Sequence, residues 1–400
     1  MVALAVAKDL PGPEAAVEGT GEGDERMYRR LSGVAALTVV ALLFVAALLL
    51  VPLLAAAGTS HAPGASTHAP GADIRPRSAR NVILAVADGT GDALLHLTRL
   101  VTAGPNGRLA LDALPYTARV VTHSTNALVT DSAAAATAMA TGHKTVNGAV
   151  GVDPDGKPLP TVLERARAAG KATGLVTTSF LADATPAAFV AHVQSRNETA
   201  SIAVQMLEAD VDVLLGGGEN DFLPVDELGC HPQPGARTDG RNLVEEAAKA
   251  GYRVVCRAEE LQHIRPRPGL RLLGLFADTE LYSHLYGNDT SLRPAARTVP
   301  GVPARVASAP VADADAAAKA VGGVVPSLAT MTRHALDILA RDPDGFFLVI
   351  EEEGTDEFLH AGMVERAVAA AQGFDEAVRV ALEFAHRHPD TLLLVTSDHE

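Results

Sequence analysis

The sequence predicts an α/β fold with a largely parallel central sheet that is flanked by helices on both faces. Short apolar, β-branched runs alternate with Ala-rich stretches of helical character over residues 80–400. The runs are apolar throughout, which is typical of strands that are buried on both faces of a parallel sheet. Ligands of such sheets bind beyond the carboxyl ends of the strands, so residues that directly follow the runs are the first candidates for a functional site.

The pattern defines the elements in order along the chain. Pro326 fits the first turn of a helix that runs to about Ala340, and residues 364–387 give a second long helical pattern. Residues 222–310 are richer in Pro, Gly and polar residues, and we interpret them as an insertion that decorates the sheet. The predicted strands cover residues 82–87, 119–122, 174–178, 211–215, 253–256, 272–276, 346–350 and 391–396.

Length and charge restrict the classes of protein to which the chain can belong. Its 400 residues suit one or two domains, and 33 Lys and Arg against 48 Asp and Glu give a net charge of −15. An acidic balance of this size repels polyanions, so we expect no nucleic-acid partner. Carboxylates that gather in one cleft are unfavourable until a cation neutralises them, which directs attention to metal sites.

The first 79 residues predict export rather than a folded domain. A polar segment (1–32) precedes an almost wholly apolar one (33–57), which follows three arginines and is long enough to cross the roughly 30 Å hydrocarbon layer of a membrane. We hold a transmembrane anchor and a cleaved signal peptide as equal alternatives, and a buried soluble helix as a minor one. Residues 58–79 resemble a flexible linker, and the folded domain spans 80–400. The expected location is extracytoplasmic: anchored to the cell membrane, or secreted or periplasmic.

The chain has two cysteines, Cys230 and Cys256, and no C-x-x-C pair. This pattern supports neither a thiolate metal site nor a redox motif. In an exported domain the two residues could form a disulfide, and two free thiols are an equal alternative.

Three predicted strands end on acidic residues. The run 82–87 leads into Asp88, the run 346–350 into Glu351, and the run 391–396 into Asp398 and His399. Any one of these alone is more often a turn or helix cap than a ligand. If the strands are neighbours, however, their ends converge and build a site for a hard cation.

Asp356 and His360 supply a further oxygen and nitrogen pair. A spacing of four places both side chains on one face of a helical turn, where they suit zinc. In isolation a solvated ion pair explains such a spacing more often. The acids at the strand ends favour the metal interpretation.

Ser132 is the candidate nucleophile. It follows Asp131 and precedes four alanines, so it lies where a helix begins, near unpaired backbone N–H groups and the positive end of the helix dipole. Asp and Ser are also common helix caps, which is the structural alternative. A neighbouring metal would hold Ser132 as an alkoxide without a histidine base.

The stretch 183–197 holds the remaining candidates. Asp183 and Thr185 can offer oxygens to magnesium, directly or through water. Arg196 can make the two parallel hydrogen bonds that a phosphate group prefers, although a lone arginine is normally a surface residue.

Together these segments resemble the alkaline phosphatase family, over about residues 81–400. The stretches TDSAAAATAMATGHKT and DATPAAFVAHVQSRN carry the resemblance. It implies an alkaline-phosphatase-like fold and metal-dependent hydrolysis of small phosphate monoesters. Ser132 would form a phosphoserine intermediate and Arg196 would clamp the phosphate. The family's cofactors are two Zn²⁺ and one Mg²⁺, and its assembly is often a homodimer.

The resemblance also implies a ligand for each metal. Asp88 would bridge one zinc and the magnesium, Asp398 and His399 would complete that zinc, and Asp356 and His360 would bind the other zinc. One zinc would activate the serine, and the other would stabilise the leaving oxygen. The magnesium would be held by Thr185 and Glu351, with Asp183 in its outer shell.

Two positions depart from the family pattern. Glu357 follows Asp356 where relatives commonly place Lys, His or Trp, so the charge near the magnesium or phosphate changes. The family also supplies a third zinc ligand, a His well downstream of Asp356 and His360. This chain stops at Glu400, so we expect that the sequence is truncated.

Two other functions remain as alternatives. One places the chain in the same wider superfamily, which also holds sulfatases and phosphodiesterases, but changes the substrate to a phosphodiester or a sulfate ester. The other is a membrane-tethered metal-binding protein without turnover. It is motivated by Glu357 and by the downstream His ligand that this sequence does not include.

Overall fold

The computed structural model describes residues 2–7, 79–287 and 325–400, all of which belong to one compact unit. The predicted apolar segment 33–57 and nearly all of the linker lie outside these ranges. Among the described residues, no helix is long and apolar enough to cross a membrane.

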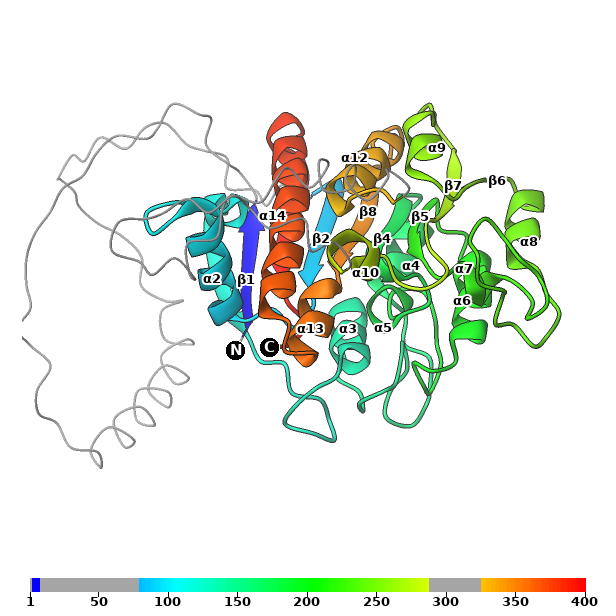
Figure 1. Cartoon of the computed structure of the whole chain (residues 1–400), viewed down its shortest axis with the longest axis horizontal. Coiled ribbons are helices and arrows are strands. Elements are labelled where there is room, and N and C mark those ends of the chain that lie inside the picture. Colours follow the sequence, from blue (N-terminus) through cyan, green and yellow to red (C-terminus); the bar gives the residue numbers. More distant parts are fainter. Residues whose placement is uncertain (1, 8–78, 288–324) are drawn as a thin grey trace, which may run out of the picture. The chain divides into compact units, whose positions relative to one another are not determined.

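A single sheet in the order β3-β1-β9-β2-β8-β4-β5-β7-β6 forms the centre of the described structure (Figure 1). The seven strands from β9 to β6 are all parallel, and β1 is antiparallel to both β9 and β3. The predicted α/β class with a largely parallel sheet is therefore confirmed. The strands are β1 Val2–Ala7, β2 Asn81–Ala87, β3 Tyr116–Val120, β4 Ala172–Phe180, β5 Val213–Gly217, β6 Tyr252–Val255, β7 Arg271–Leu275, β8 Phe346–Glu352 and β9 Thr391–Thr396.

Two regions of the sheet differ in detail from the sequence-based expectation. Residues 2–7 form a strand, which their position in a polar N-terminal segment did not indicate. The segment 222–310 contributes the parallel strands β7 and β6 at one edge of the sheet, so it extends the sheet as well as decorating it.

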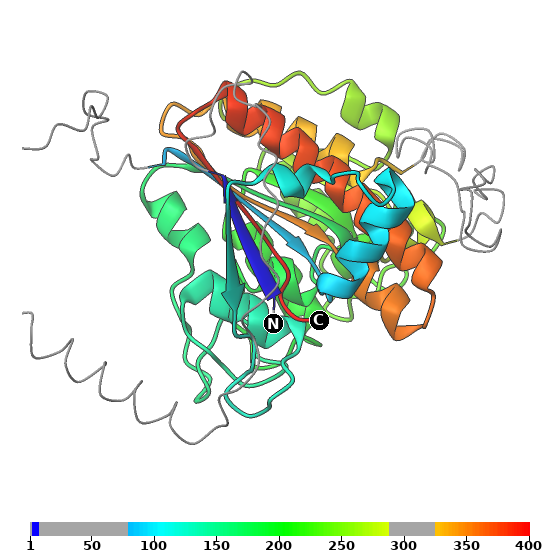
Figure 2. The ribbon, with the colours of Figure 1, turned by 90° about the vertical axis from the view of Figure 1, so that its left-hand side faces the viewer.

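Helices cover both faces of the sheet, as Figure 2 shows. On one face α12 (Leu328–Leu339) and α14 (Val364–Arg387) pack on the strands, and α2 (Asp92–Ala103) packs on α14. On the other face lie α3 (Ser132–Thr141), α4 (Val162–Ala168), α5 (Ala184–Ala187) and α6 (Thr199–Glu208). The shorter helices are η1 (Ala110–Ala113), α7 (Glu219–Phe222), α8 (Leu243–Lys249), α9 (Ala258–Gln262), α10 (Tyr282–Tyr286) and α13 (Gly354–His360).

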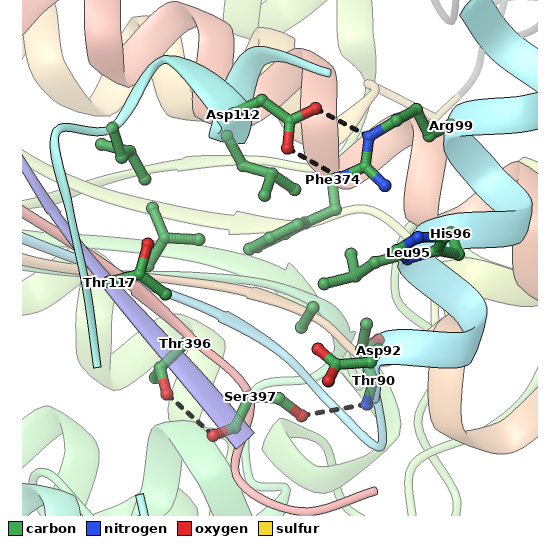
Figure 3. A pocket seen from close by; sticks show the side chains of 14 residues that line it. Thr90, Asp92, Leu95, His96, Arg99, Asp112, Thr117, Phe374, Thr396 and Ser397 are labelled. Carbon is green, nitrogen blue, oxygen red and sulfur yellow. Dashed lines mark hydrogen bonds and ion pairs between the residues drawn. The ribbon is translucent and has the colours of Figure 1, made fainter. Parts of the chain in front are cut away.

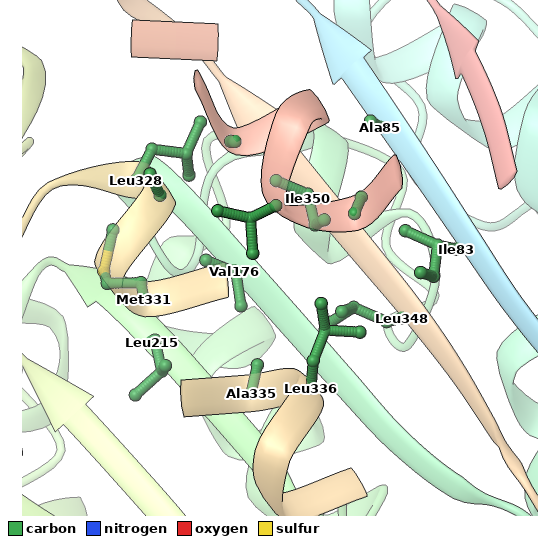
Figure 4. Packing of buried hydrophobic residues seen from close by; sticks show 14 of the residues in the cluster. Ile83, Ala85, Val176, Leu215, Leu328, Met331, Ala335, Leu336, Leu348 and Ile350 are labelled. Atoms are coloured by element: carbon green, nitrogen blue, oxygen red, sulfur yellow. The ribbon is translucent and has the colours of Figure 1, made fainter. Parts of the chain in front are cut away.

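Successive residues of each central strand enter opposite cores. In β2, Ile83 packs with Leu336 and the other residues of α12 and α14 (Figure 4), whereas Leu84 packs with Ala133 and the other residues of α3 to α6. This alternation explains why the strand sequences are apolar throughout. It also fixes the face on which each polar residue at a strand end emerges.

Cys230 and Cys256 form a disulfide, with Cα atoms 6.3 Å apart. The bond ties the loop after α7 to the end of β6. The alternative of two free thiols is excluded.

Candidate active site and metal centre

The parallel strands β9, β2 and β8 are neighbours, and their carboxyl ends bring three acids together. Ala87 pairs with Glu352 and Val86 with Thr396, so Asp88 emerges between the ends of β8 and β9. Asp88, Glu351 and Asp398 are each at least 98% buried. The structure therefore assembles the three strand-end acids that the sequence singled out.

The ring nitrogen Nε2 of His399 lies at the centre of this group. It is 3.3 Å from Oγ of Ser132, 3.4 Å from Oδ1 of Asp88 and 3.2 Å from Oδ2 of Asp398. Ligand atoms around a tetrahedral zinc with bonds of about 2.1 Å lie about 3.4 Å apart. The three contacts thus have the spacing of tetrahedral zinc ligands.

Several oxygens of the cluster have no hydrogen-bond partner. Both carboxylate oxygens of Asp88, Oδ2 of Asp398 and Oε1 of Glu351 are buried without one. An unpaired buried charge costs several kcal/mol, so a buried acid stays neutral unless a cation compensates its charge. These residues therefore fit a metal centre.

The pKa values of these acids are raised by burial and by the negative charges of their neighbours. Burial, followed by the charges of Asp398 and Glu351, raises the pKa of Asp88 well above its ordinary value. Burial and the charge of Asp183 raise the pKa of Glu351 to about 8. A bound divalent cation stabilises the ionised carboxylates and opposes both effects.

Ser132 is the first residue of α3, and Asp131 caps this helix. The Asp131 carboxylate accepts hydrogen bonds from the backbone N–H groups of Ala134 (3.0 Å) and Gly148 (2.9 Å). Because Asp131 performs the capping, the Ser132 hydroxyl stays directed at His399. The alanines that follow are small and allow α3 to pack closely with α5.

Arg196 lies beside this helix start. One guanidinium nitrogen donates to Oδ1 of Asp183 at 2.8 Å, and the other is 3.8 Å from Oδ2 of Asp131. Burial alone lowers the pKa of Arg196, but the charge and hydrogen bond of Asp183 outweigh it, so the pKa is raised and the group stays cationic. Its side chain remains 31% exposed, which leaves it accessible to an anion.

Asp183 and Thr185 lie at the start of α5. The Asp183 carboxylate accepts a hydrogen bond from the Ser179 hydroxyl at 2.6 Å. The Thr185 hydroxyl is close enough to Glu351 to lower its pKa, yet it is buried and makes no hydrogen bond of good geometry. An unpaired hydroxyl beside an unpaired carboxylate oxygen suits a shared hard cation.

Asp356 and His360 lie on α13, at the outer side of the cluster. Oδ2 of Asp356 is 3.2 Å from Nε2 of His360, and Oδ1 is 4.0 Å from Nδ1 of His399. Gly89 permits this approach, because its φ is +60° and an added Cβ would lie 2.2 Å from Asp356 Oδ1. The predicted pair is therefore placed next to the strand-end cluster.

Sequence reasoning missed two acids of the run 351–353. Glu353 is 4% exposed and lies within ligand distance of Asp88 and Glu351. Glu352 points to the opposite face, where it accepts hydrogen bonds from Thr178 (2.8 Å) and Tyr286 (2.9 Å). Strand alternation was the signal that could have separated these two residues.

A cavity of about 260 Å³ adjoins the cluster without including it (Figure 3). It lies among α2, η1 and the ends of β2 and β9, with Phe374 and the ion-paired Arg99 and Asp112 in its wall. Ser397 connects it to the site, since this residue accepts a hydrogen bond from the Thr90 N–H (2.9 Å) and precedes Asp398. None of the predicted catalytic or metal-binding side chains lines this cavity.

Fold and site together define the class: a parallel α/β protein with a serine, an arginine and a cluster of carboxylates and a histidine at the strand ends, which fits a metal centre. A sequence model of the alkaline phosphatase family matches residues 79–400. The chain belongs to the alkaline phosphatase family of enzymes.

Individual relatives agree with this assignment. The chain is 36% identical to the alkaline phosphatase of Escherichia coli, over 87% of this chain and 75% of that protein. It is 38% identical to streptomycin-6-phosphate phosphatase of Streptomyces griseus, over 81% and 74%. A variant of the alkaline phosphatase from the Antarctic bacterium TAB5, solved with Mg bound in its M3 site, superposes with a TM-score of 0.63 at 27% identity, over 81% of this chain and 79% of that chain.

Proposed function

We propose that the chain hydrolyses small phosphate monoesters through a phosphoserine intermediate, releasing an alcohol and inorganic phosphate. One observation carries the proposal. The Ser132 hydroxyl lies 3.3 Å from His399 Nε2, inside a cluster of buried carboxylates, and the Arg196 guanidinium lies 3.8 Å from the neighbouring Asp131. The names of the relatives support the same reaction class.

Ser132 and Arg196 perform the chemical steps. The serine oxygen forms a bond to phosphorus on the side opposite the leaving oxygen, and the bond to the leaving alcohol breaks. Arg196 donates two hydrogen bonds to phosphate oxygens and stabilises the charge that builds there. Water then attacks the phosphoserine, and the serine–phosphorus bond breaks.

The residues of the cluster would hold two Zn²⁺ and one Mg²⁺. Asp88, Asp398 and His399 would hold one zinc, and Asp356 and His360 the other. Such ions lower the pKa of a serine hydroxyl and of water and stabilise a leaving oxygen. The magnesium ligands would be Asp88, Thr185 and Glu351, with Asp183 in the outer shell, and the Mg bound to the TAB5 enzyme supports a third position.

Location and assembly follow from other features. The composition of residues 33–57 supports an extracytoplasmic protein that is attached to the membrane if this segment is not cleaved. The disulfide between Cys230 and Cys256 supports an oxidising compartment. A homodimer remains a prediction from the family.

The test is hydrolysis of p-nitrophenyl phosphate at alkaline pH by the full chain loaded with zinc and magnesium. Ser132→Ala should lower turnover by at least about a thousandfold, because it removes the nucleophile. The exposed Ser201 of α6 provides a matched control, and Ser201→Ala should retain full activity.

Metal binding without serine-dependent turnover would contradict the proposal and favour the metal-binding protein. Faster hydrolysis of a phosphodiester or a sulfate ester than of the monoester would favour the other alternative.

A further inference from the structure

Glu353 adds a further carboxylate to the candidate metal centre, and the proposed reaction gives this carboxylate no role. It follows the end of β8 directly, and alternation along the strand places it on the same face as Glu351. Because Ala87 pairs with Glu352, the next residues, Asp88 and Glu353, lie side by side. Asp88, Glu351 and Glu353 each offer an oxygen close enough to the others to bind one ion.

The surroundings of these three carboxylates do not neutralise them. Glu353 is 4% exposed, and its carboxylate lies close to that of another acid, Asp88. Arg196, whose charge interacts with Glu353, donates its hydrogen bond to Asp183 instead. Buried carboxylates in such contact share either a proton or a cation.

Unpaired oxygens on two further elements show that a ligand belongs here. Both oxygens of Asp88 on β2 and Oε1 of Glu351 on β8 are buried without a partner, and so is the Thr185 hydroxyl of α5. Oxygens without hydrogen-bond partners on β2, β8 and α5 therefore lie beside the Glu353 carboxylate.

We propose that Glu353 is a direct ligand of the cation held by Asp88, Glu351 and Thr185, and that it shifts the preference of this position from Mg²⁺ to Ca²⁺. The inference rests on the metal centre of the proposed function. Mg²⁺ keeps several waters and is usually bound by one or two carboxylates, whereas Ca²⁺ takes six to eight oxygens in a flexible arrangement. Three carboxylates and one hydroxyl supply four oxygens if each binds once, and up to six if Glu351 and Glu353 each bind through both oxygens.

A second arrangement competes for Glu353. Its carboxylate is also close enough to Asp356 and Glu357 to bind an ion with them. Asp356, however, already contacts His360 at 3.2 Å, and Glu357 is exposed to solvent. The buried, unpaired oxygens lie on the side of Asp88 and Glu351, which favours the first arrangement.

The experiment is a calorimetric titration of Ca²⁺ and Mg²⁺ into the full, zinc-loaded chain. We expect the unmodified chain to bind Ca²⁺ more tightly than Mg²⁺. Glu353→Gln should weaken Ca²⁺ binding by at least about tenfold, because a charged ligand is lost, and should weaken Mg²⁺ binding by less than about threefold. Glu353→Asp, which keeps the carboxylate, should retain the preference for Ca²⁺.

Two variants serve as matched controls. Glu352→Gln removes the same charge one residue away, on the opposite face of the strand, and should leave the ratio of the two affinities unchanged. Glu357→Gln tests the competing arrangement and should also leave it unchanged. Circular dichroism establishes that each variant is folded.

A preference for Mg²⁺ in the unmodified chain would overturn the proposal, and so would unchanged Ca²⁺ binding in a folded Glu353→Gln variant. If Glu357→Gln also lost Ca²⁺ binding, the result would show that the ion is bound by Glu353, Asp356 and Glu357 instead, and the proposal would be wrong. These readouts do not require turnover, so failure of this inference is distinguishable from failure of the phosphatase proposal, which the Ser132→Ala assay tests.

Discussion

The two halves of the candidate metal centre are built differently. In the inner half, the side chains of Asp88 and His399 are 0% and 15% exposed, and His399 Nε2 has three contacts of 3.2–3.4 Å. In the outer half, Asp356 is 14% exposed but His360 is 74% exposed, and the two share one contact of 3.2 Å.

The difference follows from the elements that carry the ligands. Strand register positions the inner candidate ligands, since β9, β2 and β8 are paired up to their carboxyl ends. The outer pair lies on the seven-residue helix α13, where only the spacing of four aligns the side chains. We infer that the inner half is preorganised, whereas the outer half exchanges its ion and tolerates substitution more easily.

The largest expected effect comes from the inner half. Asp88→Asn keeps the shape of the side chain but removes the charge that faces both inner cation positions. We expect kcat/KM for p-nitrophenyl phosphate to fall at least about a hundredfold, with loss of bound zinc and of the third cation. His360→Ala should lose only one zinc per chain, as measured by elemental analysis. Equal metal loss in both variants would remove the distinction between the halves.

The next prediction concerns the stability of the metal-free chain and its dependence on pH. Burial raises the pKa of Glu351 to about 8 from an ordinary value of 4.5. The protonated form therefore stabilises the metal-free fold at low pH, and this stability is lost as the pH rises through about 8.

We therefore expect the chelated chain to melt at least about 5 °C lower at pH 8.5 than at pH 5.5. The zinc- and magnesium-loaded chain should show no such decrease, because cations stabilise the ionised carboxylates. Differential scanning calorimetry of both forms measures the effect, and parallel pH profiles would contradict it.

The strand ends explain how much of the site could be predicted from the sequence. Asp88, Glu351 and Asp398 follow apolar runs, and a parallel sheet necessarily brings such ends to one edge. The placement of Ser132 followed from the alanine run behind it. These inferences needed only local pattern and the general geometry of parallel sheets.

The remaining features depend on pairing that the sequence does not contain. In the run 351–353, strand alternation separates Glu352 from its two neighbours, but only the register between β8 and β2 shows that Glu353 lies next to Asp88 and that Glu352 faces Tyr286. The strand β1 likewise depends on long-range pairing with β9 and β3. Neither pattern nor composition could supply these contacts.

A smaller effect is expected at the phosphate contact. Arg196→Lys keeps the positive charge but loses the planar fork that is held between Asp183 and Asp131. Inhibition by inorganic phosphate should weaken by about tenfold, since a hydrogen bond to a charged group contributes about 1.5–3 kcal/mol. The bound metals should remain, because Arg196 faces the anion rather than the cations. Loss of zinc in this variant would show that Arg196 also organises the inner half.

The smallest effect on activity should come from the face of β8 opposite the metal centre. Tyr286→Phe removes the hydroxyl that donates to Glu352 Oε2 at 2.9 Å and leaves this buried carboxylate with one donor fewer. The free energy of unfolding should fall by about 1–3 kcal/mol, while kcat/KM changes less than about twofold. Urea denaturation and the p-nitrophenyl phosphate assay measure the two quantities. A parallel loss of activity would show that the two faces of the strand are coupled, and that the inner half depends on the packing of α10 as well as on strand register.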